Sequence, residues 1–259
     1  MIEIDGLTKR YGDKTAVDRL SFVVEPGVVT GFLGPNGAGK STTMRMIAGL
    51  DRPTSGTVRV NGTHYPGAAA PMAELGVLLD ARSVHPGLSA RANLLALART
   101  AGIGRRRVEE VIELGAAAGA RAGGFSLGMG QRLGVAAALL GQPQTVVLDE
   151  PVNGLDPDGV RWIRLLLKSL AAEGRTVFVS SHLMSLTILI FTGKGSSAGS
   201  PFRLLGLGRD LGLSPDCDHL ICARDFQHPG HPVLRTQQHQ AAAALFQGPG
   251  RDHQHTYRR

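Results

Sequence analysis

The sequence predicts an α/β fold with a mostly parallel sheet, an antiparallel β region near the N-terminus and an inserted α-helical subdomain. Short apolar runs at 145–148 and 176–180 alternate with a helical pattern at 159–172, which is typical of parallel sheets covered by helices. A glycine-rich turn at 34–41 joins the apolar run 28–33 to an amphipathic helix. A strand, a tight loop and a helix are therefore expected in direct succession.

The N-terminal segment is expected to form the antiparallel region. Alternating apolar residues at 2–4 and 16–24 indicate two strands. The dipeptide Asn61-Gly62 follows a short strand run at 57–60 and is a strong hairpin-turn signal.

The inserted subdomain is expected at about 85–140. Residues 90–140 are rich in Ala and Leu with helical periodicity, interrupted by a glycine-rich stretch at 122–124. The α/β domain is expected to end near residue 185. Beyond it, at 186–259, Glu is absent while His and Gln are frequent, so we expect an atypical, poorly ordered C-terminal tail.

Two explanations of that tail stay open. It is a natural but unusual C-terminus, or a frameshift or recombination soon after Ser185 replaced the original one. The abrupt change of composition motivates the second hypothesis. Resequencing the locus and searching the other reading frames for a conventional ending would test it.

The charge of the chain does not by itself predict a nucleic-acid partner. The net charge is +7 and the pI is near 10, but basic residues are scattered apart from Arg105, Arg106 and Arg107. These three open a helical pattern, which favours a solvated helix face over a nucleic-acid patch. No apolar run of about 18 residues and no signal-peptide pattern occur, so a cytoplasmic protein without a spanning segment is expected.

The glycine-rich turn has the residues that bind a nucleoside triphosphate. Its glycines let backbone N–H groups point at phosphate oxygens, and the following helix adds the positive end of its dipole. Lys40 is expected to reach the β- and γ-phosphates, and the Ser41 hydroxyl to bind Mg²⁺. The alternative is an ordinary turn. The predicted ATP-binding loop comprises Gly34, Pro35, Asn36, Gly37, Ala38, Gly39, Lys40, Ser41 and Thr42.

Two acids end a later apolar strand. Asp149 and Glu150 follow the run 146–148 directly. The first acid can hold Mg²⁺ through water, and the second can accept a proton from the water that attacks the γ-phosphate. Such a pair is common in isolation, but here it follows a phosphate loop and precedes Pro151.

With these motifs in order, residues 1–185 resemble the ATP-binding subunit of an ABC transporter. The resemblance implies a P-loop NTPase (RecA-like) core that uses ATP and Mg²⁺. It assigns Tyr11 to stacking on adenine, where the alternative is a plain strand residue. It also assigns Asp156 to the loop that bridges two nucleotide sites, and His182 to the γ-phosphate contact.

The segment 125–132 is similar to the family signature, which caps the ATP of the opposite subunit from a helix N-terminus. Read without the family, a helix N-cap explains it equally well. The residues assigned to this contact are Ser126, Leu127, Gly128, Met129 and Gln131.

Two positions depart from the family pattern. Leu127 stands where a glycine is usual, although this variant is similar to that of multidrug and antibiotic exporters. Asp80 stands where the family commonly has a glutamine that senses Mg²⁺, and its extra negative charge could alter the coupling of hydrolysis to transport.

The resemblance implies an ATPase on the inner face of the cell membrane. Two copies are expected to form a homodimer that sandwiches ATP and drives a separately encoded transmembrane permease, exporting drug-like or lipid-like substrates. Two alternatives remain. One is a soluble ABC-type ATPase of DNA repair or translation, and the other is a truncated cassette without function.

Overall fold

The computed structural model describes residues 1–64, 70–112, 115–181, 202–206 and 220–222. Its centre is a six-stranded sheet in which every neighbouring pair is parallel, as the sequence predicts. In spatial order its strands are β5 (Leu75–Leu78), β6 (Thr145–Leu148), β7 (Thr176–Ser181), β3 (Val29–Leu33), β8 (Phe202–Gly206) and β9 (Leu220–Cys222).

The expected antiparallel region is a separate three-stranded sheet. Its order is β2 (Lys14–Val24), β1 (Ile2–Tyr11) and β4 (Ser55–Val60). The turn predicted after β4 is confirmed: Asn61 and Gly62 both have positive φ, 50° and 79°, as a type I′ turn requires, and Val60 bridges to Thr63.

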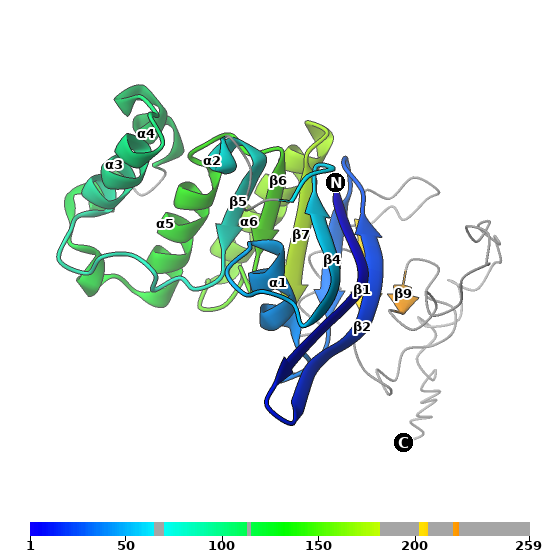
Figure 1. Cartoon of the computed structure of the whole chain (residues 1–259). Helices are drawn as coiled ribbons and strands as arrows, with labels where there is room; N and C mark the ends of the chain where they lie inside the picture. Colours follow the sequence, from blue (N-terminus) through cyan, green and yellow to red (C-terminus); the bar gives the residue numbers. More distant parts are fainter. Residues whose placement is uncertain (65–69, 113–114, 182–201, 207–219, 223–259) are drawn as a thin grey trace, which may run out of the picture.

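Helix α1 (Lys40–Ile47) lies between the two sheets (Figure 1). Its Met44 and Ile47 belong to a core cluster with strand residues from both sheets. The rings of Phe22, Phe32 and Phe178 fill the middle of this cluster, with centroids 5.2–5.6 Å apart. The phosphate loop is thus attached to a helix that is enclosed on both sides.

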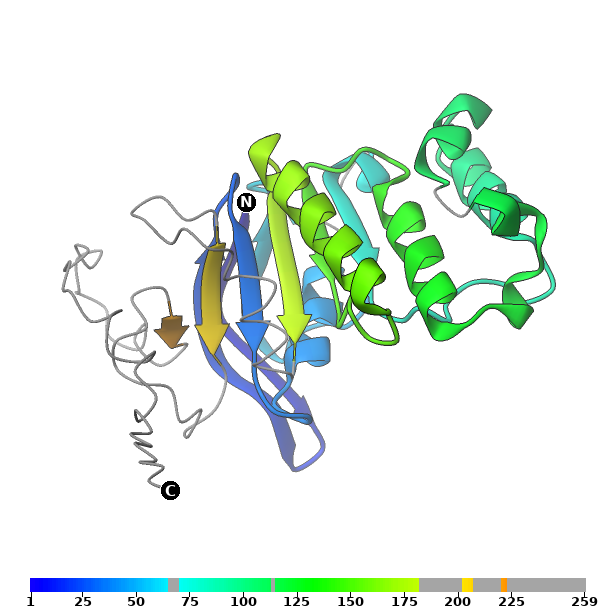
Figure 2. The ribbon, with the colours of Figure 1, turned by 180° about the vertical axis from the view of Figure 1, so that it is seen from behind.

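The opposite face of the parallel sheet is covered by α6 (Pro157–Ala172), as the view from behind shows (Figure 2). Ile163, Leu167 and Leu170 pack there against Val146 and Val177. Three-residue and four-residue spacing puts these α6 side chains on one helix face. The predicted helix at 159–172 is confirmed and begins two residues earlier.

The helices expected within 90–140 are present. They are α3 (Ala90–Thr100), α4 (Arg105–Val111) and α5 (Leu127–Leu139), with 3₁₀ turns at Gly115–Gly119 and Ala122–Gly124, and a four-residue helix α2 (Pro71–Glu74) precedes β5. We call α3, α4 and the α5 face toward them the helical lobe. On α5, Leu133 and Leu140 pack in the lobe, whereas Val135 and Ala138 pack on the parallel sheet. Helix α5 therefore connects the two regions.

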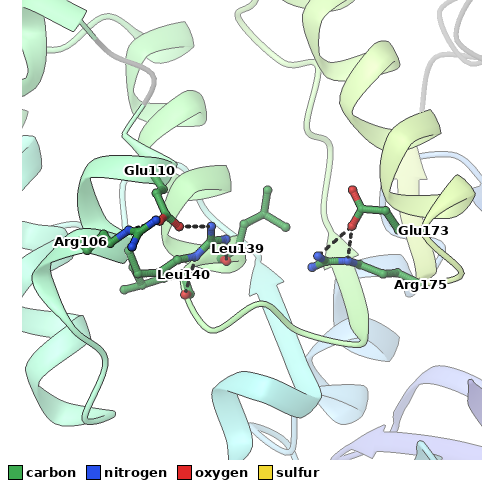
Figure 3. A network of polar contacts seen from close by, with 7 residues as sticks. Arg106, Glu110, Leu139, Leu140, Glu173 and Arg175 are labelled. Carbon is green, nitrogen blue, oxygen red and sulfur yellow. Dashed lines mark hydrogen bonds and ion pairs between the residues drawn. The ribbon is translucent and has the colours of Figure 1, made fainter.

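The basic run at the start of α4 has a partly structural role that the sequence did not reveal. Arg107 donates to the carbonyls of Leu139 (2.9 Å) and Leu140 (3.2 Å), and its guanidinium also pairs with Glu110 (Figure 3). Arg105 and Arg106 fit the predicted solvated face: both are exposed, and the side chain of Arg106 is 93% exposed. The last carbonyls of α5 are thereby capped by the lobe.

Two strands come from the segment expected to be an atypical tail. β8 pairs with β3, and Leu205 on it is buried in the same core cluster as Phe32. The sequence did not predict this strand, because Phe202–Gly206 carries no motif and stands in a segment without a sustained apolar pattern. The prediction for the rest of 186–259 lies outside the described residues. Among the helices that are described, none has the length and apolar character needed to cross a membrane.

Candidate nucleotide site

The predicted site residues meet at the carboxyl edge of the parallel sheet. Strand pairing aligns Leu33 of β3 with Ser181 of β7. It also aligns Leu148 of β6 with Val179 of β7 and with Leu78 of β5. The loops that follow these strands start side by side, which is where parallel α/β sheets bind ligands.

The glycine-rich loop has the backbone shape that phosphate binding needs. Gly37 and Gly39 have φ of 82° and 93°, in the left-handed region that favours glycine. At Gly39 an added Cβ would also lie 2.4 Å from the carbonyl oxygen of Ala16, so no larger residue fits. Helix α1 begins immediately afterwards, at Lys40, and its N-terminus faces the loop.

Lys40 is enclosed by this loop. Its side chain is 6% exposed, and its Nζ donates to the carbonyls of Gly34 (2.6 Å) and Pro35 (3.2 Å). The same Nζ lies 3.9 Å from Oε1 of Glu150. Burial lowers the pKa of Lys40, and the negative charges of Glu150 and Asp149 partly oppose that shift. The structure thus places the cation of the loop beside the carboxylate of Glu150.

The two acids at the end of β6 are held by the neighbouring strand. The hydroxyl of Ser180 on β7 donates to Oδ1 of Asp149 and accepts from the N–H of Glu150 at 3.0 Å. The Asp149 N–H donates to the Leu78 carbonyl at 2.7 Å. Asp149 is therefore held from both sides, by β7 and by β5, and the backbone of Glu150 is held by β7.

Gln131 also contacts the acid pair. Its Nε2 donates to the backbone carbonyl of Glu150 at 3.0 Å, and the residue is only 3% exposed. The predicted role of Gln131 as a contact to a second subunit is not addressed by this hydrogen bond. The contact that is observed lies within one chain.

Tyr11 stands at the end of β1 with half of its surface exposed, at 49%. Its hydroxyl donates to Oδ2 of Asp51 at 3.0 Å, and Arg45 of α1 pairs with the same carboxylate at 2.9 Å. The pKa of Tyr11 is raised, first by desolvation and then by the hydrogen bond to Asp51 and its negative charge, while Arg45 and then Thr42 oppose the shift. An exposed ring beside the first turn of α1 suits the predicted stacking on a base.

The signature segment begins α5. Ser126 is the N-cap, its Oγ accepting from the Met129 N–H at 3.2 Å. At Gly128 an added Cβ would lie 2.8 Å from the Gly154 carbonyl oxygen, and at Gly154 one would lie 2.5 Å from the Leu127 side chain. Leu127, the departure from the family pattern, therefore covers Gly154 in the loop that leads to Asp156.

Two predicted residues make local contacts. Asp156 caps α6 by accepting from the Gly159 N–H at 2.8 Å, and exposed Asp80 accepts from the Arg82 N–H at 2.8 Å. Asp80 follows β5 at the same sheet edge as the acid pair. His182 lies outside the described residues, directly after the end of β7 at Ser181.

The residues at this edge fit ATP and Mg²⁺. A buried ammonium between loop carbonyls and a carboxylate supplies the cation that a triphosphate requires. Ser41 and Asp149 present oxygen donors, the class that Mg²⁺ prefers, and the Asp149 carboxylate is already oriented by Ser180.

Sequence reasoning missed Ser180, Asp51 and Arg45. Ser180 is fully buried, at 0% exposure. The signal available in the sequence was a serine at the end of an otherwise apolar strand run, since a buried hydroxyl needs a hydrogen-bond partner. Asp51 and Arg45 carry no motif, because their contact with Tyr11 depends on the path of the chain after α1.

Comparison with known proteins agrees with this geometry. The profile of the ABC transporter family matches residues 17–153. The bacitracin transport ATP-binding protein BcrA of Bacillus licheniformis is 43% identical over 194 residues, covering 71% of this chain and 62% of the relative. The Nod factor export ATP-binding protein I of Paraburkholderia xenovorans is 41% identical over 219 residues, covering 79% and 72%.

The fold is likewise similar to solved cassettes. The dimeric structure of MJ0796, a bacterial ABC transporter cassette, aligns with a TM-score of 0.65 at 27% identity, covering 72% of this chain and 90% of that one. A post-hydrolysis state of the same cassette, bound to ADP and Pi, aligns equally well with a TM-score of 0.65.

Proposed function

The chain belongs to the ABC transporter family as an ATP-binding subunit, and we propose that it hydrolyses ATP to power a membrane permease. The observation that carries this proposal is the approach of Lys40 Nζ to Glu150, 3.9 Å, inside a glycine-rich loop at a sheet edge. A triphosphate-binding cation and a candidate base thereby share one site.

In the proposed reaction a water oxygen bonds to the γ-phosphorus, and the bond from that phosphorus to the bridging oxygen breaks, giving ADP and phosphate. Glu150 orients the water and accepts or polarises its proton. Lys40 and the loop N–H groups bind the charge on the phosphate oxygens. Ser41 and Asp149 would hold Mg²⁺, which when bound supplies further neutralisation of that charge.

The proposed assembly is a homodimer with a separately encoded permease, on the inner face of the membrane. The similarity to a cassette solved as a dimer supports the pairing. In that pairing Ser126, Gly128 and Met129 would meet the partner's ATP from the N-terminus of α5. His182 would contact the γ-phosphate of its own chain's ATP.

Export is the favoured direction. The relatives are named for bacitracin transport and for Nod factor export, which supports export of drug-like or lipid-like substrates. The aligned region spans only 62% of BcrA, so the substrate is inferred from part of that relative's length. Co-purification of an integral membrane protein with the tagged chain, from detergent extracts of its native cells, would support the permease. Isolation of only soluble partners would favour a repair or translation role.

The hydrolysis proposal is tested by Glu150→Gln. The substitution keeps the size of the side chain but removes its basicity, so kcat should fall about 10²- to 10⁴-fold while Mg-ATP still binds. Glu109→Gln, at an exposed glutamate of the lobe, is the matched control and should retain the wild-type rate. Equal rates for Glu150→Gln and wild type would refute the assignment of the base.

A further inference from the structure

The peptide of Glu150 has an unusual conformation. Its φ is 50°, in the left-handed region that a non-glycine residue rarely adopts. Such a conformation is strained and persists only where the surroundings hold it. The contacts that hold this peptide therefore also determine where the Glu150 carboxylate points.

Those contacts come from two other elements. The N–H donates to Ser180 Oγ of β7 at 3.0 Å, and the carbonyl accepts from Gln131 Nε2 of α5 at 3.0 Å. The carbonyl also accepts from the Asn153 N–H at 3.1 Å, within its own turn. Ser180 and Gln131 are 0% and 3% exposed, so water does not compete for either bond.

The Gln131 amide that donates to the Glu150 carbonyl belongs to α5. This helix packs against the lobe through Leu133 and Leu140, and its terminal carbonyls are held by Arg107 of α4 (Figure 3). Its N-terminus, capped by Ser126, carries the signature segment. The Glu150 peptide is thus held on one side by a helix shared with the lobe and on the other by Ser180 of the sheet.

We propose that Gln131 and Ser180 are positioning residues that hold the left-handed Glu150 peptide, and that Gln131 makes the position of the catalytic carboxylate depend on the position of α5. This inference rests on the proposed hydrolysis. It gives Gln131 a role inside its own chain, in addition to the predicted contact with a second subunit.

The principal test is Gln131→Met in the full chain, with Mg-ATP as substrate. Met keeps the length of the side chain and removes the donor, and the Glu150 carbonyl keeps its bond from Asn153, so the chain should fold. Loss of positioning should lower kcat roughly 10- to 100-fold, with KM within about twofold of wild type. Gln144→Met, at an exposed glutamine, is the matched control and should change neither constant.

A double-mutant cycle separates positioning from a general structural role. If Gln131 acts through the Glu150 carboxylate, Gln131→Met should lower single-turnover rates about 10-fold or more in the wild type and less than about twofold in Glu150→Gln. Additive losses would overturn the proposal. Ser180→Ala should likewise lower kcat, and Gln131→Leu, which also removes the donor without adding charge, is the second variant should Gln131→Met fail to fold.

The outcomes also distinguish the two proposals. A folded wild-type chain that does not hydrolyse Mg-ATP defeats the proposed function, and the positioning role with it. A wild-type chain that hydrolyses Mg-ATP beside a Gln131→Met variant with an unchanged kcat overturns the positioning role alone.

Discussion

The parallel sheet and the helical lobe are packed from different residues. The core that the parallel sheet shares with α1 and the antiparallel sheet, here called the sheet core, is centred on three touching phenylalanine rings, Phe22, Phe32 and Phe178. The lobe core contains no aromatic ring that is fully buried among the described residues and consists of small and medium side chains. Its buried members are Ala90, Leu94, Ala98, Val108, Ala122, Leu133, Ala136 and Leu140.

The difference shows which region fixes the site. Burial of apolar area stabilises by about 25 cal/mol per Å², so large rings anchor the sheet more firmly than alanines anchor the lobe. Lys40, Asp149 and Ser180 all stand on elements of the sheet core. Helix α5, which the lobe shares with the sheet, contacts the site through the hydrogen bond from Gln131 to the Glu150 carbonyl.

The largest expected effect is at the centre of the sheet core. Phe178→Ala removes one of three touching rings and should lower the free energy of unfolding by about 3–5 kcal/mol. Ala98→Gly in the lobe should cost only about 1 kcal/mol, mainly through helix propensity. Urea unfolding followed by circular dichroism measures both. Comparable losses in the free energy of unfolding for the two variants would contradict the claim that the sheet core is anchored more firmly than the lobe.

A smaller effect is expected where α5 meets β5. At Gly76 an added Cβ would lie 2.1 Å from the Ala138 carbonyl, so Gly76→Ala must push the backbones apart and should cost about 1–3 kcal/mol. At Gly134 the nearest atom is the end of the Leu78 side chain, 2.5 Å away, which can rotate. Gly134→Ala should change stability by less than about 1 kcal/mol. Thermal unfolding of both variants is the check, and a larger loss at Gly134 would be inconsistent with this packing.

The smallest effect concerns the charge of Lys40. Burial lowers the pKa of Lys40 in the folded chain below its ordinary value of 10.5. At pH values between these two pKa values, Lys40 is protonated in the unfolded chain and neutral in the folded one. Stability without nucleotide should therefore rise with pH through that window relative to Lys40→Met, which lacks the group. Chemical denaturation at several alkaline pH values compares the two. A free energy of unfolding that falls with pH in the wild type relative to Lys40→Met would contradict the lowered pKa.

The sequence predicted the parts of the fold that depend on local pattern. The strand Thr145–Leu148 and the turn at Asn61 were both visible as short runs with clear chemistry. β8 was not, since its place beside β3 comes from a distant segment without periodicity of its own. Likewise, Arg107 was predicted to be solvated, because no local signal shows that its guanidinium reaches the end of α5.

The candidate site likewise contains residues that local motifs predict and contacts that only the fold reveals. Lys40 and Glu150 were predicted from motifs, and the structure brings them together. The contacts of Ser180 and Gln131 with the Glu150 peptide join three elements that are far apart in sequence, so only the sheet register and helix packing reveal them. The roles of His182, Asp80 and Asp156 in hydrolysis stay predictions.

The central claim is that the loop around Lys40 binds a triphosphate. Isothermal titration of Mg-ATP into the folded wild-type chain and into Lys40→Ala tests it directly. The account predicts saturable binding by the wild type and, for a buried cation removed from the phosphates, affinity at least about tenfold weaker in the variant. Equal affinity in the two folded proteins, or none in the wild type, would contradict it.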